Sequence, residues 1–147
     1  MKAADVSIAP TTALGDWYGD SFGVRYRRLA ILMSERSLLP VIVEQRDLRN
    51  LFSALHNAWT ELLRRLEVPA QLIEAELHEM NDVRLGPTRS RSVLASMNDM
   101  KRHAHWLLTT QDPSLLGLEL DLSGVPCGPL GYRSPREVTV DLLRRTR

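Results

Sequence analysis

The stretch FGVRYRRLAILM, residues 22–33, gives the clearest strand signal in this sequence of 147 residues. Residues 22–26 alternate apolar with polar or small side chains, which is the period of a strand that buries one face. The apolar run 29–33 is typical of a second, more deeply buried strand. We expect Arg27-Arg28 to form the turn, so the stretch predicts a β-hairpin.

Further strands are expected around this hairpin. The segment 38–43, LLPVIV, predicts a third strand, in which Pro40 has no N–H for a ladder and so belongs at an edge or at the start of the strand. Residues 83–85 could form a short strand. Residues 1–14 lack periodicity, and we expect either a loose arm or an irregular first strand there.

The later part of the chain shows helical periodicity. Apolar residues recur with a 3.6-residue period over 47–66, then from about Pro69 to Met80, and again over 90–109. The segment 114–122 fits a short helix or a strand equally well. A capping box, Ser134-Pro135-Arg136-Glu137, predicts the start of a last helix.

Strands early and helices late favour an α+β class. We expect a small antiparallel sheet, made of the N-terminal hairpin plus edge strands, packed on one face against three to four helices. The length suits a single domain over 1–147, with 1–14 and 144–147 as its loosest parts.

Composition narrows the class of protein. Hydrophobic residues make up 44% and charged residues 25%, as in globular proteins, and no apolar run is long enough to span a bilayer. The N-terminus lacks the apolar segment of a secretory signal, and the single cysteine excludes an internal disulfide. We therefore expect a cytoplasmic protein without membrane contact.

The charge is nearly balanced, with a formal net charge of +1. All the basic residues except Lys2 and Lys101 are arginines, whose planar guanidinium suits carboxylates and phosphates. A GC-rich genome would produce the same bias. Composition alone therefore does not argue for a nucleic-acid partner, although one remains possible.

One polar cluster is predicted on the helix over 90–109. Four side chains fall on one side of it because four or seven residues return a helix to the same face. These candidate catalytic residues are Arg91, Asn98, Arg102 and His105. The alternative is a solvated polar face, on which the neighbouring Asp99–His103 pair would contribute only tenths of a kcal/mol.

The entrance to this helix is a candidate anion or ligand site. Arg89 and Arg91 lie where the helix N–H groups and dipole favour negative charge, and Trp17 is a candidate wall. Trp17 stands in the string Gly15-Asp16-Trp17-Tyr18, which could be a surface recognition loop. The commoner use of such a Trp–Tyr pair is an anchor that closes one end of a sheet.

Other catalytic templates are weaker. Arg49 and His56 match the arginine–spacer–histidine motif of HEPN-type ribonucleases, but HEPN domains are all-helical and the pattern is loose. The histidines and Cys127 lack metal-ligand spacing, and no glycine-rich phosphate loop occurs. Cys127 is expected to be a small packed residue. We expect no metal and no cofactor.

Three strings together resemble a known family. They are TALGDWY at 12–18, RSVLASMND at 91–99 and PCGPL at 126–130. Their order and spacing are similar to those of small bacterial proteins described only as a domain of unknown function, over about residues 10–130. The resemblance implies no activity, cofactor or catalytic set. Ser90 departs from it, because asparagine is expected there.

The leading functional hypothesis is a binding or interaction domain, for example an accessory component of a toxin–antitoxin or mobile-element system. It would act with a protein partner or as a homodimer. The alternative is a nucleic-acid-directed enzyme, such as a nuclease-like toxin, that uses the four candidate residues on the helix. That alternative requires them to converge on a concave pocket walled by Trp17 or Trp106.

Overall fold

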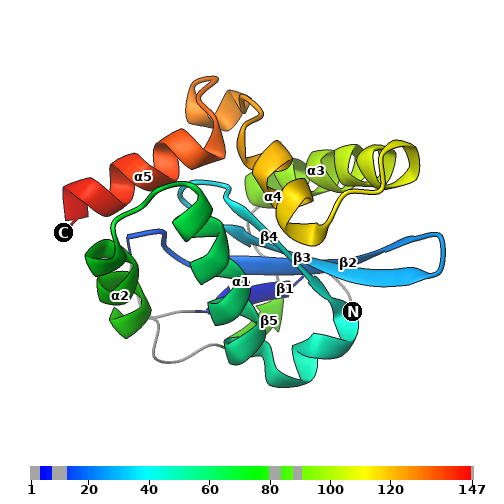
Figure 1. Ribbon diagram of the computed structural model, residues 1–147, viewed down its shortest axis with the longest axis horizontal. Helices are drawn as coiled ribbons and strands as arrows, with labels where there is room; N and C mark the ends of the chain where they lie inside the picture. Colours follow the sequence, from blue (N-terminus) through cyan, green and yellow to red (C-terminus); the bar gives the residue numbers. More distant parts are fainter. Residues whose placement is uncertain (1–3, 8–12, 80–83, 88–90, 147) are drawn as a thin grey trace.

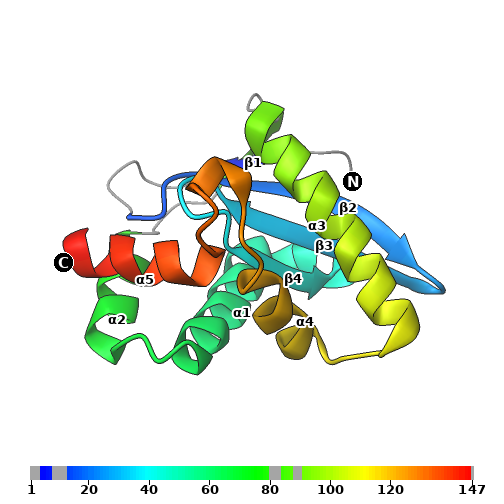
Figure 2. The same cartoon turned by 90° about the horizontal axis from the view of Figure 1, so that it is seen from above.

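The protein is a five-stranded antiparallel sheet with helices on both faces, as the computed structural model shows (Figures 1 and 2). The structure describes residues 4–7, 13–79, 84–87 and 91–146. The elements in chain order are β1 (Ala4–Ser7), β2 (Trp17–Val24), β3 (Arg27–Ser34), β4 (Pro40–Glu44), the 3-10 helix η1 (Gln45–Asn50), α1 (Leu51–Arg65), α2 (Ala70–Glu79), β5 (Arg84–Pro87), α3 (Arg91–Thr110), α4 (Leu115–Ser123), the 3-10 helix η2 (Gly128–Leu130) and α5 (Pro135–Thr146). The strand order is β4-β3-β2-β1-β5.

The predicted hairpin is confirmed as β2 and β3, with a different turn. Val24 pairs with Arg27, so the two-residue turn is Arg25-Tyr26 and not Arg27-Arg28. Arg25 takes a left-handed backbone with φ of 56°. That conformation favours glycine, so nothing in the local sequence marks the turn.

The expected neighbouring strands are present. β4 pairs with β3 at one edge of the sheet and begins at Pro40, where the missing N–H costs least. β1 lies between β2 and β5, and β5 forms the other edge. The first strand is therefore an inner strand, although the sequence around it lacks strand periodicity.

The helices follow the expected segments closely. The periodic stretch 47–66 becomes η1 followed by α1, and the ambiguous stretch 114–122 is the helix α4. The Ser114 side chain caps α4 by accepting a hydrogen bond from the Gly117 N–H at 3.0 Å. The capping box of α5 forms as predicted, with reciprocal bonds between Ser134 and Glu137.

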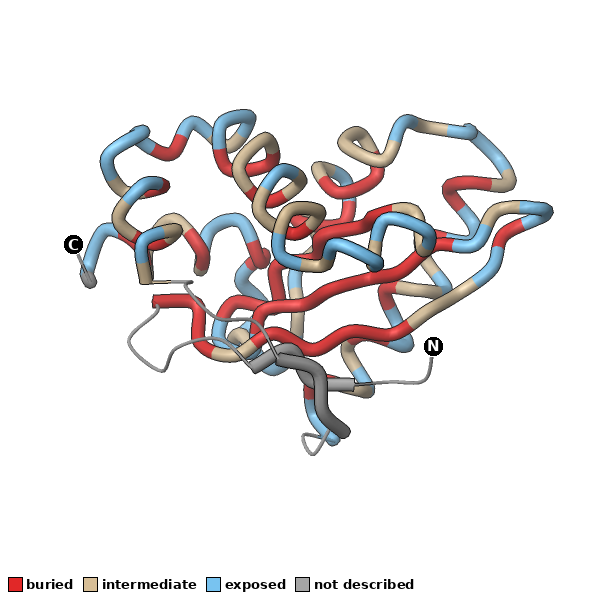
Figure 3. The backbone as a smooth tube through the Cα atoms, turned by 90° about the horizontal axis from the view of Figure 1, so that it is seen from below, coloured by how far each residue is buried: buried red, intermediate tan, exposed pale blue. Residues whose placement is uncertain are grey.

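Two hydrophobic cores lie on the two faces of the sheet. The first packs β3 and β4 side chains such as Leu32 and Val41 against α1 and, further out, against α2 and α5. The second packs Ile31 and Ile42 against α3 and α4. Figure 3 shows β2 and β3 buried along most of their length.

The α+β class is confirmed, but the helices cover both faces of the sheet and not one. The reason is visible in β3, whose residues from Leu29 to Ser34 are all buried. A strand that is buried on both faces needs cover on each side. Within the described ranges, no helix has the length and apolar character needed to cross a membrane.

Candidate functional site

Helix α3 separates an apolar side from a polar side. Its buried residues belong to the core beneath it, and they are Val93, Met97, Met100, Ala104, Leu107 and Leu108. The side that flanks β2 carries Asn98, Arg102 and His105, all three exposed. The helical spacing therefore does bring these three predicted residues together.

These residues line a shallow cavity of about 480 Å³ between α3 and the hairpin. Its other lining residues are Phe22 and Gly23 from β2 and Lys101 from α3. Lys101 forms an ion pair with Asp20 on β2, which ties the helix to the sheet. Arg102 forms an exposed pair with Asp99, one turn back on the same helix.

The tip of the hairpin reaches the C-terminal end of α3. The Arg25 Nη2 donates a hydrogen bond to the Thr109 carbonyl oxygen at 3.1 Å, where a cation also complements the negative end of the helix dipole. Next to Arg25, Tyr26 is fully exposed, and Trp106 on α3 is 56% exposed. We define the hairpin–α3 surface as Arg25, Tyr26, Asn98, Lys101, Arg102, His105 and Trp106.

The remaining predicted site residues lie apart from this surface or outside the described residues. Arg91 is the first residue of α3 and is exposed, seven residues before Asn98. Arg89 lies outside the described residues. Trp17 is fully buried in the core on the opposite face of the sheet from α3, with Tyr18 buried on the α3 side. This is the anchoring arrangement of the Trp–Tyr pair, and it leaves the indole without a surface to offer a ligand.

A second cavity, of about 220 Å³, joins two of the strings that carry the family resemblance. Ser96, Asp99 and His103 from α3 line it together with Cys127. Burial, and then the charge of Asp99, raise the pKa of the Cys127 thiol. The structure thus supplies the histidine neighbour that the sequence did not show, but the raised pKa opposes formation of a thiolate nucleophile.

The HEPN-like pair has no helical bundle around it. His56 packs edge-on against Phe52, with ring centroids 5.5 Å apart, and Arg49 lies on the exposed 3-10 helix η1. The five-stranded sheet also differs from an all-helical domain. The fold therefore gives no support to a HEPN-type ribonuclease site at Arg49 and His56.

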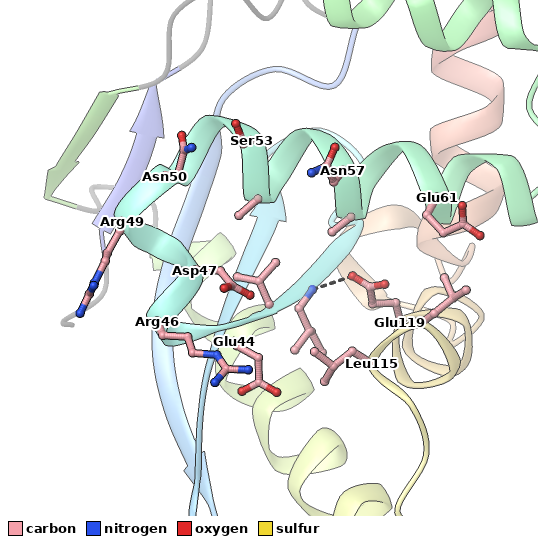
Figure 4. A pocket seen from close by; sticks show the side chains of 15 residues that line it. Glu44, Arg46, Asp47, Arg49, Asn50, Ser53, Asn57, Glu61, Leu115 and Glu119 are labelled. Carbon is pink, nitrogen blue, oxygen red and sulfur yellow. Dashed lines mark hydrogen bonds between the residues drawn. The ribbon is translucent and has the colours of Figure 1, made fainter.

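A cavity larger than these two was not predicted from the sequence. It measures about 680 Å³ and lies between β4, η1, α1 and α4 (Figure 4). Glu119 of α4 lines it and is only 2% exposed, and its Oε2 accepts a hydrogen bond from the Ile42 N–H at 2.7 Å. Burial raises the pKa of Glu119 to about 8, and the bond from Ile42 opposes that rise only in part.

Among the residues that the structure describes, no group of three or more histidine, cysteine, aspartate or glutamate side chains is placed to hold a metal ion. The described residues offer three features on which a function can be built. They are the shallow cavity beside Asn98, Arg102 and His105, the cavity beside Cys127, and the buried carboxyl of Glu119.

Comparison with known proteins gives one match. A family model described as a domain of unknown function, DUF6933, matches residues 1–138. No curated protein and no solved structure matches the chain.

Proposed function

The chain belongs to the DUF6933 family of unknown function, and we propose that it binds single-stranded nucleic acid on the hairpin–α3 surface. The observation that carries the proposal is the convergence of Asn98, Arg102 and His105 on one shallow cavity beside the hairpin tip. Two exposed aromatic side chains border the same surface.

The charge of the surface suits a polyanion. Arg25, Lys101 and Arg102 supply three cations, of which Lys101 is paired with Asp20 and Arg102 with Asp99. Arginine binds phosphate oxygens with a planar, bidentate fork, and such contacts give most of the affinity for a nucleic-acid backbone. Arg91 lies further along the same helix and extends the basic track.

The aromatic residues favour a single strand over a duplex. Unpaired bases stack on exposed tyrosine and tryptophan rings, whereas the bases of a duplex are already stacked on one another. Tyr26 and Trp106 are two of the four large hydrophobic residues that are exposed within the described part of the chain. Tyr26 follows Arg25 at the hairpin tip and Trp106 follows His105 on α3, with the Trp106 ring 6.4 Å from that of His103, so both rings are exposed for stacking near the cations.

The geometry favours binding over bond cleavage. A hydrolytic site holds its acid, base and substrate in a concave, water-excluding pocket. Asn98, Arg102 and His105 instead lie exposed around a shallow depression. A nuclease-like enzyme would need these side chains to be ordered by the bound strand.

The first experiment measures binding of a labelled oligothymidylate by fluorescence anisotropy over a series of salt concentrations. Affinity is expected to fall with salt with a slope in log units of about −0.7 for each phosphate neutralised, as is usual for single strands. A duplex of the same sequence should bind more weakly. Absence of binding at low salt, or a response that does not depend on salt, would refute the proposal.

Alanine variants of single residues test whether nucleic acid binds at the hairpin–α3 surface. Arg102→Ala and Trp106→Ala should each weaken binding by roughly three- to thirty-fold, since stacking and charged contacts contribute about 1–2 kcal/mol each. Arg64→Ala is the matched control, because Arg64 is also an exposed helical arginine paired with an acid of its own helix, but it lies on α1 across the sheet. Equal losses in Arg64→Ala and Arg102→Ala would show non-specific attraction only.

We further propose that such a domain serves a toxin–antitoxin or mobile-element system, with a protein partner or as a homodimer. The support is the exposed basic surface itself, on which Asn98, Arg102 and His105 lie together beside the hairpin. Induced expression of wild type and of Arg102→Ala in a bacterial host tests the toxic version. Equal growth of both strains would argue against a toxin that acts through this surface.

A further inference from the structure

The cavity beside Glu119 is separate from the hairpin–α3 surface, because it lies at the β4 edge of the sheet. Its volume of about 680 Å³ falls in the range of small-molecule sites. Its floor is apolar and consists of Ile42, Val43, Ala54, Ala58, Leu115 and Leu116. The cavity therefore has room and apolar surface for the body of an organic molecule.

One buried polar group faces this apolar floor. Glu119 reaches from α4 toward β4, and its Oε2 is occupied by the Ile42 N–H (Figure 4). Its other oxygen, Oε1, has no hydrogen-bond partner among the described residues. This oxygen keeps some accessible surface, since it is not one of the described side-chain atoms that are both fully buried and without a partner, so a ligand in the cavity can reach it.

Among the described residues, no cation pairs with this carboxyl. Arg46 and Arg49 lie at the mouth of the cavity, and Figure 4 shows Arg49 extending away from Glu119. Neither arginine forms an ion pair with Glu119 in the described part of the chain. A buried carboxylate needs an opposite charge to offset its desolvation, so this cavity has a place for a cation that the chain itself leaves unfilled.

The acids around the cavity are already engaged or lie at its rim. Glu44 pairs with Arg27 at 2.6 Å, and Glu61 pairs with Arg65 at 3.3 Å. Asp47 lies on η1 at the exposed rim. Polar groups on successive turns, Asn50, Ser53 and Asn57, add hydrogen-bonding capacity along one wall.

We propose that this cavity binds a small organic cation, with its apolar body on the floor and its amidinium or amine head on the free oxygen of Glu119. The head group donates hydrogen bonds to the carboxylate and supplies the missing charge. The only covalent change is loss of the carboxyl proton of Glu119, which passes to solvent when the cation binds. The proposal does not depend on nucleic-acid binding at the other surface.

Three probes that share a benzene ring and differ in charge test whether the cavity selects a cation. Benzamidine carries the cation, benzamide is its neutral analogue and benzoate is the anion. Isothermal titration calorimetry of the full chain should detect benzamidine, with benzamide and benzoate at least tenfold weaker. Binding of benzamide or benzoate as tight as that of benzamidine would overturn the proposal.

The pH dependence gives a second, independent test on the wild-type chain. Because the cation selects ionised Glu119, its affinity should rise roughly tenfold per pH unit from pH 6 until the pKa of about 8 is reached. Titrations in buffers of different ionisation enthalpy should show release of a proton. Affinity that does not change over this range would refute a role for the Glu119 carboxyl.

The variant Glu119→Gln keeps an amide oxygen for the Ile42 N–H but cannot ionise. It should weaken benzamidine at least tenfold at pH 8 and remove the pH dependence. Asp121→Asn is the matched control, since Asp121 is an exposed carboxylate on the same helix α4 and does not line the cavity. Equal affinity of wild type and Glu119→Gln would overturn the proposal, whether or not the chain binds nucleic acid.

Discussion

Two buried glutamates show how the partners of a side chain decide its chemistry. Glu76 on α2 uses both oxygens, accepting hydrogen bonds from the Ala13 N–H at 2.9 Å and the Leu14 N–H at 3.1 Å. Glu119 on α4 has one such donor, from Ile42. Glu76 therefore anchors the segment before β2 to α2, whereas Glu119 keeps an unused oxygen and a raised pKa.

Glu119 should make the stability of the protein fall as pH rises. The pKa of Glu119 is about 8 in the folded state, against the ordinary glutamate value of 4.5 that applies to the unfolded chain. Between these two pH values the folded state holds a proton that the unfolded state has lost. The free energy of unfolding then decreases with pH across that window and becomes constant above pH 8. At about 1.4 kcal/mol per pKa unit, the decrease is on the order of a few kcal/mol.

Urea unfolding of wild type and Glu119→Gln at several pH values measures this effect. The stability of wild type relative to the variant should be highest near pH 4.5 and should fall toward pH 8. Glu61→Gln, which alters a half-exposed carboxylate, serves as the comparison. Parallel stability curves for wild type and Glu119→Gln would contradict the raised pKa.

At the scale of one element, the start of α5 depends on a single serine. The Ser134 N–H donates to Glu137 Oε1, and the Glu137 N–H donates to Ser134 Oγ, both at 3.3 Å. Ser134→Ala removes the hydroxyl and leaves an N–H at the helix start without a partner. We expect a loss of roughly 1 kcal/mol in urea unfolding, the usual cost of losing an N-cap.

A second cap provides the comparison for this prediction. Ser114→Ala removes a single bond, from the Gly117 N–H to Ser114 Oγ, at an exposed site. Its cost should be smaller than that of Ser134→Ala, because water can replace the lost acceptor. An unchanged midpoint for Ser134→Ala would show that packing alone holds the first turn of α5.

Elements that depend on local signals were predictable, and elements that depend on tertiary contacts were not. The capping box and the 3.6-residue period located α5, α1 and α3. Helix α4 was ambiguous because it faces both cores: Leu116 and Leu120 pack on one side, and Leu118 and Leu122 on the other. Apolar residues on several sides erase the amphipathic period.

The same distinction applies to the candidate sites. Asn98, Arg102 and His105 could be grouped from the sequence because one helix carries them all. The cavity at Glu119 could not, because its walls come from β4, α1 and α4, which meet only in the folded chain. Glu119 and Asp121 both lie among the leucines of α4, and the sequence does not show that Glu119 is the buried one and Asp121 the exposed one.

At the scale of the whole molecule, the sheet separates two cores that should contribute independently to stability. Ile31 and Leu32 are adjacent in β3 but belong to different cores, and both are fully buried. Ile31→Val should cost about 0.5–1.5 kcal/mol and Leu32→Ala about 2–5 kcal/mol. The double variant should lose the sum to within about 0.5 kcal/mol, since the two side chains share no packing partners.

Chemical denaturation of the three variants measures this additivity. A double variant that loses clearly more or less than the sum would show that strain passes through the backbone of β3. Coincident transitions by fluorescence and circular dichroism would show that the two cores unfold together.

The position of β1 between β2 and β5 has a consequence for the order of folding. Strands β2, β3 and β4 pair through short connections, whereas Ala4 pairs with Pro87 from roughly eighty residues away, at a much larger loop-closure entropy. The meander can form as soon as its own residues meet, but β5 has no place in the sheet until β1 has docked. Joining the two ends of this long loop is therefore the slow, non-local step, and it determines how fast the native sheet is completed.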